Sequence, residues 1–334
     1  MIEINGALGE GGGQILRTAL TLSLLTQTPI IIKNIRAKRP KPGLMRQHLA
    51  CVKAAVAICD GQALGAELHS TELVFNPAPV RPGQYRFEIG SAGSTTLVFQ
   101  TILLPLLLAE GESRVSFNGG THNPLAPSLT EIKRGFIPIL KRMGASLDIT
   151  TEQWGFAPFG GGQWGATLYP SKLRSIDLSD RGELISSHVR CYISAVRHSV
   201  AERELSAYAE DCPVKIDDSD VRFPQSVSPG NVLAHHLTFE NSTVCLSRLG
   251  DKRRSAENIA KQLNEQCRGF IASGAAVCEH LADQLMLPMW VAGGGRLTTS
   301  KLSRHSQTNI DIIKRITGKQ FKTQQQDLKT VISL

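Results

Sequence analysis

The chain has 334 residues, with 37 Lys and Arg against 29 Asp and Glu, and a formal net charge of +8. An apolar fraction of 41% with 20% charged residues is typical of a globular protein and excludes disordered, collagen-like and coiled-coil classes. The longest apolar stretch, residues 97–109, contains Gln100 and Pro105 and is too interrupted to span a bilayer, so no membrane partner is expected. The positive charge alone is a weak indication of a polyanionic partner such as nucleic acid.

The seven cysteines are odd in number and never have C-x-x-C spacing. This usage argues against a disulfide framework or a structural zinc and favours a reducing compartment. The chain opens without a basic and apolar leader, so we expect a cytoplasmic protein.

Three segments along the chain open with glycine and continue through an apolar helix into a strand. The first runs from residue 9 to a strand at 30–32, the second from 90 to a strand at 113–118, and the third from 274 to a strand at 296–301. A second helix with apolar residues at i, i+3 and i+4 follows each strand and stops at a glycine. These helices are expected at 45–59, 129–143 and 308–317.

Further strands are expected at 73–75 and 85–89 in the first unit and at 146–150 in the second. The pattern predicts an α/β (α+β) fold in which a large domain holds three repeated units of two helices and a four-stranded sheet. Chance similarity of short α/β segments is the alternative.

Residues 181–272 break this pattern and predict a smaller inserted α/β domain. The stretch has strand signals at 184–196 and 232–239 and helix signals at 198–209 and 255–270. We therefore assign 1–180 and 273–334 to the large domain and 181–272 to the insert.

The first glycine-rich turn, residues 9–13, fits neither the dinucleotide-binding nor the Walker spacing. A structural tight turn is at least as good an interpretation as a phosphate loop. Glu10 within the turn is more informative, because a carboxylate beside a phosphate site usually serves a metal or acts as a general base.

Five cationic residues and two prolines lie in the segment 36–46. A solvated charged loop is the simplest interpretation, but Arg46 at a helix start opposes the helix dipole unless an anion lies nearby, which favours phosphate binding. The turn-rich loop at 118–127, with two prolines and a glycine pair, could form a rigid wall for a flat base or simply connect two elements.

His305 is the candidate nucleophile. It follows the third strand and precedes a helix expected near Thr308, and a helix N-terminus disfavours imidazolium while attracting phosphate. A structural role is the alternative for a lone loop histidine. The other histidines show no H-E-x-x-H pattern, so a zinc enzyme is not expected.

In this order, the segments resemble the RNA 3′-terminal phosphate cyclase family over essentially the whole chain. The resemblance rests on residues 9–17, 40–48, 90–94, 119–121, 158–162, 281–289 and 305–309. It implies a fold of three repeated α/β units with an inserted domain, similar to enolpyruvyl transferases and to the C-terminal domain of a translation initiation factor.

The resemblance also implies a ligase that forms a phosphoric ester bond, with ATP as co-substrate and a divalent metal, Mg²⁺ or Mn²⁺. The family's histidine, at the position of His305, attacks the α-phosphate of ATP to give a histidine–AMP intermediate. AMP then passes to an RNA 3′-phosphate, and the adjacent 2′-hydroxyl displaces AMP to form a 2′,3′-cyclic phosphate. No obligatory protein partner is indicated.

Carried over position by position, the resemblance assigns site residues. Glu10 matches the acidic residue near metal and triphosphate. The RNA or ATP phosphates would be held by Arg17, Arg39, Arg46 and Gln47. The ATP pocket would comprise Gln100, Pro127, His280, Leu281, Ala282, Asp283 and Gln284, with Asp283 a ribose or metal contact. His280 stands where bacterial relatives commonly have a stacking Tyr, and an imidazole stacks with less area.

Two other function classes remain to be weighed. A non-catalytic cyclase-like protein of ribosome assembly would lack the nucleophilic histidine, whereas His305 and Glu10 are present here. An enolpyruvyl transferase is disfavoured because the glycine-rich turn and the His305 segment do not belong to that chemistry. If the chain is a cyclase, the important cations bind one RNA end. The salt dependence of RNA affinity should then correspond to about two or three phosphate contacts rather than eight.

Overall fold

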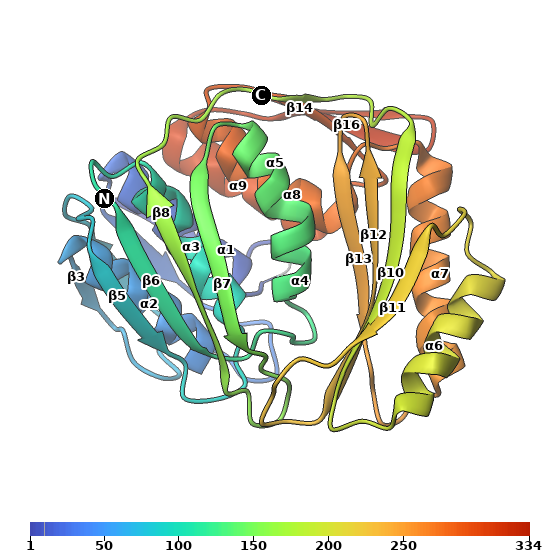
Figure 1. Ribbon diagram of the computed structural model, residues 1–334. Helices are drawn as coiled ribbons and strands as arrows, with labels where there is room; N and C mark the ends of the chain where they lie inside the picture. Colours follow the sequence, from blue (N-terminus) through green and yellow to red (C-terminus); the bar gives the residue numbers. More distant parts are fainter. Residues whose placement is uncertain (10) are drawn as a thin grey trace.

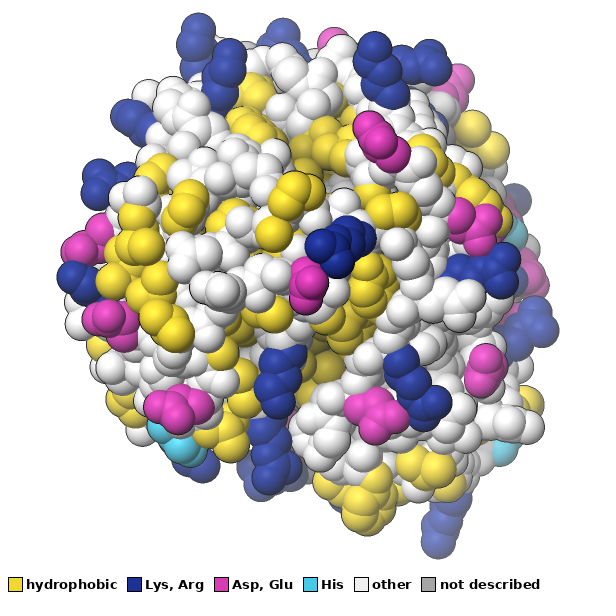
Figure 2. Space-filling model, turned by 90° about the vertical axis from the view of Figure 1, so that its left-hand side faces the viewer, with side chains coloured by type: hydrophobic (Ala, Val, Ile, Leu, Met, Phe, Trp, Pro, Cys, Tyr) yellow, Lys and Arg dark blue, Asp and Glu magenta, His cyan; other side chains and the backbone are white. Residues whose placement is uncertain are grey.

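The structure, a computed structural model, describes residues 1–9 and 11–334 and arranges their strands in four sheets of four strands each (Figure 1). The predicted metal residue Glu10 lies outside the described residues. Within the described chain, no helix is both long enough and apolar enough to cross a membrane. Figure 2 shows Lys and Arg side chains scattered over one face among acidic and apolar ones rather than gathered in a single basic patch.

The first sheet contains strands β1 to β4 in the order β1-β2-β4-β3, with β1 parallel to β2 and the other pairs antiparallel. Its strands are β1 (Ile2–Asn5), β2 (Ile30–Lys33), β3 (Gln62–Leu64) and β4 (Leu73–Asn76). Helix α1 (Gln14–Thr26) connects β1 to β2, and α2 (Arg46–Cys59) connects β2 to β3.

The second sheet repeats this topology in the order β5-β6-β8-β7. Its strands are β5 (Gln84–Glu88), β6 (Ser113–Gly119), β7 (Ser146–Gln153) and β8 (Gly162–Tyr169). The connections are α3 (Thr95–Leu107) and a helical segment made of α4 (Leu129–Glu131), a π-helical turn (Ile132–Phe136) and α5 (Ile137–Arg142).

The third sheet has the same topology again, in the order β9-β14-β16-β15. Its strands are β9 (Asp177–Leu178), β14 (Arg296–Thr299), β15 (Lys322–Gln326) and β16 (Lys329–Ser333), and its helices are α8 (Glu279–Val291) and α9 (Arg304–Thr317). The α/β fold with repeated two-helix, four-strand units is therefore confirmed.

One strand was assigned to the wrong unit. The sequence places residues 85–89 in the first unit, but β5 pairs in parallel with β6 and opens the second sheet. The error arises because strand pairing is a long-range property, whereas proximity along the chain linked this strand to β4. The first unit instead begins with β1, which the sequence analysis did not identify.

A fourth sheet, ordered β11-β10-β12-β13, lies between β9 and α8 in the chain. Its strands are β10 (Leu184–Ser194), β11 (Asp218–Arg222), β12 (Gly230–Phe239) and β13 (Thr243–Leu249), and its helices are α6 (His198–Glu210) and α7 (Ala256–Ser273). Both helices cover the outer face of this sheet (Figure 1). The division of the chain into domains at 181 and 272 stays a prediction.

The two ends of this insertion are joined by Arg181. Its guanidinium donates to the carbonyl oxygens of Phe270 at 3.4 Å and Ile271 at 3.1 Å and lies 4.9 Å from the centre of the Phe239 ring. The chain therefore leaves and re-enters the third unit at nearly the same place.

Helices α1 and α3 are buried on almost every side. A polar side chain on such a helix needs a hydrogen-bond partner in the interior. The Thr21 hydroxyl, for example, donates to the carbonyl oxygen of Thr101 at 2.9 Å. Helix α1 also packs on α9. This central position brings polar residues near the start of α1 next to the third unit.

Candidate active site

A cavity of about 1010 Å³ opens where α1, α3, α8 and α9 meet the loop at 123–128 and the β13–α7 connection of the insertion. The first turns of α1, α8 and α9 all border it, through Gln14, His280 and His305. Because the N-terminus of a helix carries unsatisfied N–H groups and a partial positive charge, such an arrangement favours anions such as phosphates.

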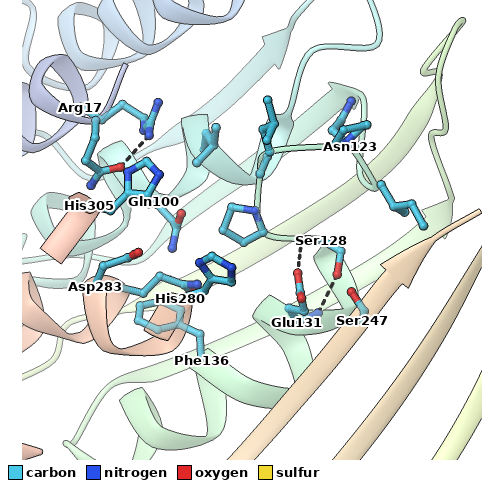
Figure 3. A pocket seen from close by; sticks show the side chains of 18 of the residues that line it. Arg17, Gln100, Asn123, Ser128, Glu131, Phe136, Ser247, His280, Asp283 and His305 are labelled. Carbon is cyan, nitrogen blue, oxygen red and sulfur yellow. Dashed lines mark hydrogen bonds between the residues drawn. The ribbon is translucent and has the colours of Figure 1, made fainter. Parts of the chain in front are cut away.

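The cavity brings together seven of the residues proposed from the sequence. These residues are Arg17, Gln100, Pro127, His280, Asp283, Gln284 and His305. Figure 3 shows Arg17, Asp283 and His305 at one end and Glu131 and Ser247 at the other, with His280 between them.

Other proposed residues do not line the cavity. Leu281 and Ala282 are only 4% and 0% exposed and pack in the core, so any contact that they make with a nucleotide comes from their backbone. Arg39, Arg46 and Gln47 lie outside the cavity lining as well.

His305 is the second residue of α9, which begins four residues earlier than the sequence suggested. Ser303 caps the helix by accepting a hydrogen bond from the backbone N–H of Ser306 at 2.9 Å. The expected position at a helix start is thus correct, but His305 belongs to the first turn rather than to a preceding loop. Its half-buried ring is held at a fixed position on the helix.

Asn309, one turn after His305, links the helices that border the cavity. Its Oδ1 accepts hydrogen bonds from Thr18 Oγ1 at 2.6 Å and from Gln14 Nε2 at 3.0 Å, both on α1. Its Nδ2 donates to the backbone carbonyl of Asp283 on α8 at 2.9 Å. Asn309 is 1% exposed, so water does not compete for these bonds.

The same network reaches Arg17, whose guanidinium donates to Gln14 Oε1 at 2.6 Å (Figure 3). Side chains on α1, α8 and α9 are therefore positioned relative to one another through Gln14 and Asn309. The sequence analysis included both residues in motifs but assigned a role to neither. A run of polar residues on helix faces that otherwise bury apolar side chains could have indicated them.

A neutral histidine lies beneath the start of α1. Burial, with Arg17 and Arg36 nearby, lowers the pKa of His48 to about 3, and its Nδ1 accepts a hydrogen bond from the N–H of Met45 at 3.1 Å. A Cβ on Gly13 would lie 2.5 Å from His48 Nε2, so only glycine fits there. The glycine-rich turn is packed directly on α2.

Gln47 fastens the start of α2 to the second unit. Its Oε1 accepts a hydrogen bond from the N–H of Ser94, the residue that caps α3, at 3.0 Å. Its amide N–H groups stay directed away from that bond and can donate to a phosphate. Arg46 beside it is exposed at the first position of α2.

The end of the cavity beyond His280 carries a half-buried carboxylate that the sequence analysis missed. Glu131 accepts a hydrogen bond from the N–H of Ser128 at 2.7 Å and in turn donates its own N–H to Ser128 Oγ, a reciprocal helix cap. Burial raises the pKa of Glu131, against the opposing effect of hydrogen bonds from Ser128 and Ser247. Its Ser-x-x-Glu spacing was a recognisable cap signal.

A metal ion would have few protein ligands here. Within residues 1–9 and 11–334, no three His, Cys, Asp or Glu side chains come together as a metal-binding group. Mg²⁺ commonly binds through one or two carboxylates together with substrate phosphates, and Asp283 at the His305 end of the cavity fits such a site.

Comparisons with known proteins agree on one family. A model of the family described as RNA 3′-terminal phosphate cyclase matches residues 8–323. A protein named RNA 3′-terminal phosphate cyclase from Pseudomonas fluorescens is 45% identical over 314 residues, which cover 94% of this chain and 91% of that protein. A protein of the same name from Salmonella typhimurium is 44% identical over 322 residues, 96% of this chain and 95% of that one.

Among solved structures, the enolpyruvyl transferase NikO from Streptomyces tendae matches 51% of this chain and 33% of its own, with 14% identity and a TM-score of 0.30. A likeness at this level carries no inference about the chain.

Proposed function

Because the chain belongs to the RNA 3′-terminal phosphate cyclase family, we propose that it converts the 3′-terminal phosphate of RNA to a 2′,3′-cyclic phosphodiester at the expense of ATP. The observation that supports this most directly is the cavity in which His305, Arg17 and Asp283 lie together at the starts of α1, α8 and α9. That arrangement suits a reaction in which every step is an attack on phosphorus.

In the first step, a ring nitrogen of His305 attacks the α-phosphate of ATP. An N–P bond forms, the bond from the α-phosphorus to the bridging oxygen breaks, and pyrophosphate leaves. The phosphoramidate stores the activation until RNA arrives. The fixed position of His305 on a capped helix supports this role, because a nucleophile must be held near the attacked phosphorus.

In the second step, an oxygen of the RNA 3′-phosphate attacks the phosphorus of the histidine-bound AMP, and the N–P bond breaks. The product carries a 3′-pp-5′-A end. The adjacent 2′-hydroxyl then attacks the RNA phosphorus, loses its proton and expels AMP. A phosphate monoester oxygen is a poor leaving group, whereas AMP leaves readily, which is why an adenylylated intermediate is needed.

The residues divide between two substrates. Gln100, Pro127, His280, Asp283 and Gln284 surround the nucleotide, with the backbone at 281–282 completing the pocket. Arg17 stands between the two substrates, and the RNA phosphate is held by Arg17, Arg39, Arg46 and Gln47. The Gln47–Ser94 bond supports this division, since it sets the α2 cations beside the second unit.

A divalent metal, Mg²⁺ or Mn²⁺, would be held by Glu10 and Asp283 together with the ATP phosphates. When bound, it would neutralise negative charge on the triphosphate. Arg17 adds positive charge on the protein side, and its bond to Gln14 fixes the direction of its guanidinium.

The test is incubation with α-labelled ATP and metal, followed by denaturing electrophoresis. Acid-labile, alkali-stable label should appear on the wild type and be lost in His305→Ala. Equal labelling of both proteins, or turnover of RNA without any labelling, would contradict the mechanism. RNA binding without labelling or turnover would instead support a non-catalytic relative.

A further inference from the structure

Three apolar side chains are exposed on loops near the cavity, and of these three Leu125 is the one that lines it. Phe159 is 69% exposed, Val227 is 59% exposed and Leu125 is fully exposed. Pro158 and Leu125 line the cavity mouth from two different loops. Exposed apolar side chains that gather beside a cavity, rather than standing singly, are typical of binding surfaces.

The loop that carries Phe159 is held by hydrogen bonds. The N–H of Phe159 donates to Ser228 Oγ at 3.2 Å, and the N–H of Gly160 donates to the carbonyl of Phe156 at 2.7 Å. A Cβ on Gly161 would lie 2.5 Å from Val227, so the two loops are in close contact. The ring is therefore presented to solvent by an ordered backbone.

A chain of contacts leads from this loop to the proposed RNA site. A Cβ on Gly160 would lie 2.9 Å from Ala92 Cα, and the side-chain amide of Asn123 donates to the Ala92 carbonyl. Two residues further on, the N–H of Ser94 donates to Gln47 Oε1. The loop at 91–94 thus bridges Phe159 and Gln47, which we place at the RNA phosphate.

We propose that Phe159, together with Leu125, forms a stacking platform for a base near the 3′ end of a single-stranded RNA. The inference rests on the proposed function, because Arg46 and Gln47 would hold the terminal phosphate next to this platform. Bases of single-stranded nucleic acids stack on exposed aromatic rings largely regardless of sequence, which suits an enzyme that acts on RNA ends. Leu125 belongs to the loop at 118–127, for which the sequence left open either a wall for a flat base or a simple connection.

The size of the surface favours RNA over a protein partner. An aromatic side chain buries about 150–250 Å². Three side chains therefore offer far less than the roughly 800 Å² per partner of a stable protein interface. Exposed Arg46 adjoins Gln47 at the far end of this chain of contacts, and a cation there complements an RNA backbone rather than a neutral surface.

The test measures RNA binding without turnover. Fluorescence anisotropy of a short 3′-phosphorylated oligonucleotide is recorded with the wild type, Phe159→Ala, Phe159→Leu and Phe159→Trp. We expect Phe159→Ala to bind at least about fivefold more weakly, Phe159→Leu to show most of that loss, and Phe159→Trp to bind like the wild type. The dependence of affinity on salt should be the same for all four proteins, because no phosphate contact is lost.

Phe223→Ala is the matched control. Phe223 is 66% exposed but stacks on His198 with the ring centres 5.7 Å apart, and neither of its chain neighbours lines the cavity, whereas Phe159 follows Pro158, which does. A single abasic residue, moved through the last positions of the oligonucleotide, identifies the stacked base: at that position Phe159→Ala should cause no further loss.

Equal losses of affinity in Phe159→Ala and Phe223→Ala would overturn the proposal. So would a loss in Phe159→Ala that persists wherever the abasic residue is placed. Wild-type affinity in a Phe159→Ala protein with a normal melting temperature would overturn it as well. A wild-type protein that does not bind the oligonucleotide would overturn the proposed function itself. If the wild type binds normally and the Phe159 substitutions leave the affinity unchanged, only the stacking platform is overturned.

Discussion

Replacing Asn309 with alanine should disturb stability and catalysis together. The substitution removes three hydrogen bonds, two accepted from Gln14 and Thr18 and one donated to the Asp283 carbonyl. At about 1 kcal/mol net for each bond, and with the Thr18 hydroxyl able to turn to the backbone carbonyl of Gln14 one helical turn earlier, the free energy of unfolding should fall by about 2 to 3 kcal/mol.

The effect on catalysis follows from what these bonds connect. Without Asn309, no side chain of this network bonds to both α1 and α8, so His305 is held less precisely relative to Arg17 and Asp283 although the helices still pack together. Small displacements of a reacting group are costly, and we expect AMP transfer to His305 to slow by about 10- to 100-fold. Asn309→Asp keeps an oxygen that can accept from Gln14 and Thr18, but it turns a second carboxylate oxygen toward the Asp283 carbonyl, so AMP transfer should also be slow.

Two measurements separate stability from positioning. Urea unfolding gives the free energy, and single-turnover transfer from α-labelled ATP, at a temperature where every variant is folded, gives the rate. Gln307→Ala is the control, since its exposed side-chain amide on the same helix donates to Asp311 and its loss should change stability by less than about 0.5 kcal/mol. An Asn309→Ala protein that is destabilised but labels at the wild-type rate would refute the positioning role.

Three further predictions concern charge. Arg46→Ala should weaken binding of a 3′-phosphorylated oligonucleotide but not of its 3′-hydroxyl counterpart; equal losses for both would remove Arg46 from the terminal phosphate. Burial lowers the pKa of His122 from 6.5 to about 3, so between these values the unfolded chain binds a proton that the folded chain does not. Stability should fall as pH drops through this window, by about 1.4 kcal/mol per unit, and His122→Gln should flatten the urea-derived profile by that amount; an unaltered slope would contradict the assignment. Burial raises the pKa of Glu204 from 4.5 to about 7, so stability should fall as pH rises through that range, and Glu204→Gln should abolish up to about 3 kcal/mol of difference between pH 4 and pH 8; a variant with the wild-type difference would rule this out.

The repeated units could be predicted because their signals are local. Apolar helices, glycine stops and strands of several residues can be recognised in a short window, and α1, α3 and β6 follow those signals closely. Strands β3 and β9 span three and two residues and have too little pattern to detect. The pairing of β5 with β6 depends on contacts across α3, which no local window contains.

The candidate site was predictable where motifs carry its residues and not where tertiary contacts create it. His305 and Asp283 follow from segments typical of the family, whereas the hub at Asn309 exists only because α1 approaches α9 from the other end of the chain. The burial of Leu281 was itself predictable, since Leu281, Leu285 and Met289 recur at the spacing of one buried helix face. The assignment of Leu281 to the ATP pocket gave the family motif more weight than this helical periodicity.

The insertion also governs the order in which the third unit can assemble. Strand β9 pairs with β14 through Asp177 and Leu178, and residues 179–295 lie between the two strands. Closing so long a loop is entropically costly in an unfolded chain. If the insertion folds first, the Arg181 bonds to Phe270 and Ile271 hold its ends together, and only a short connection to α8 remains to be closed. Ribosomal synthesis delivers the insertion before β14, so the ends of the insertion can already be held together when β14 emerges.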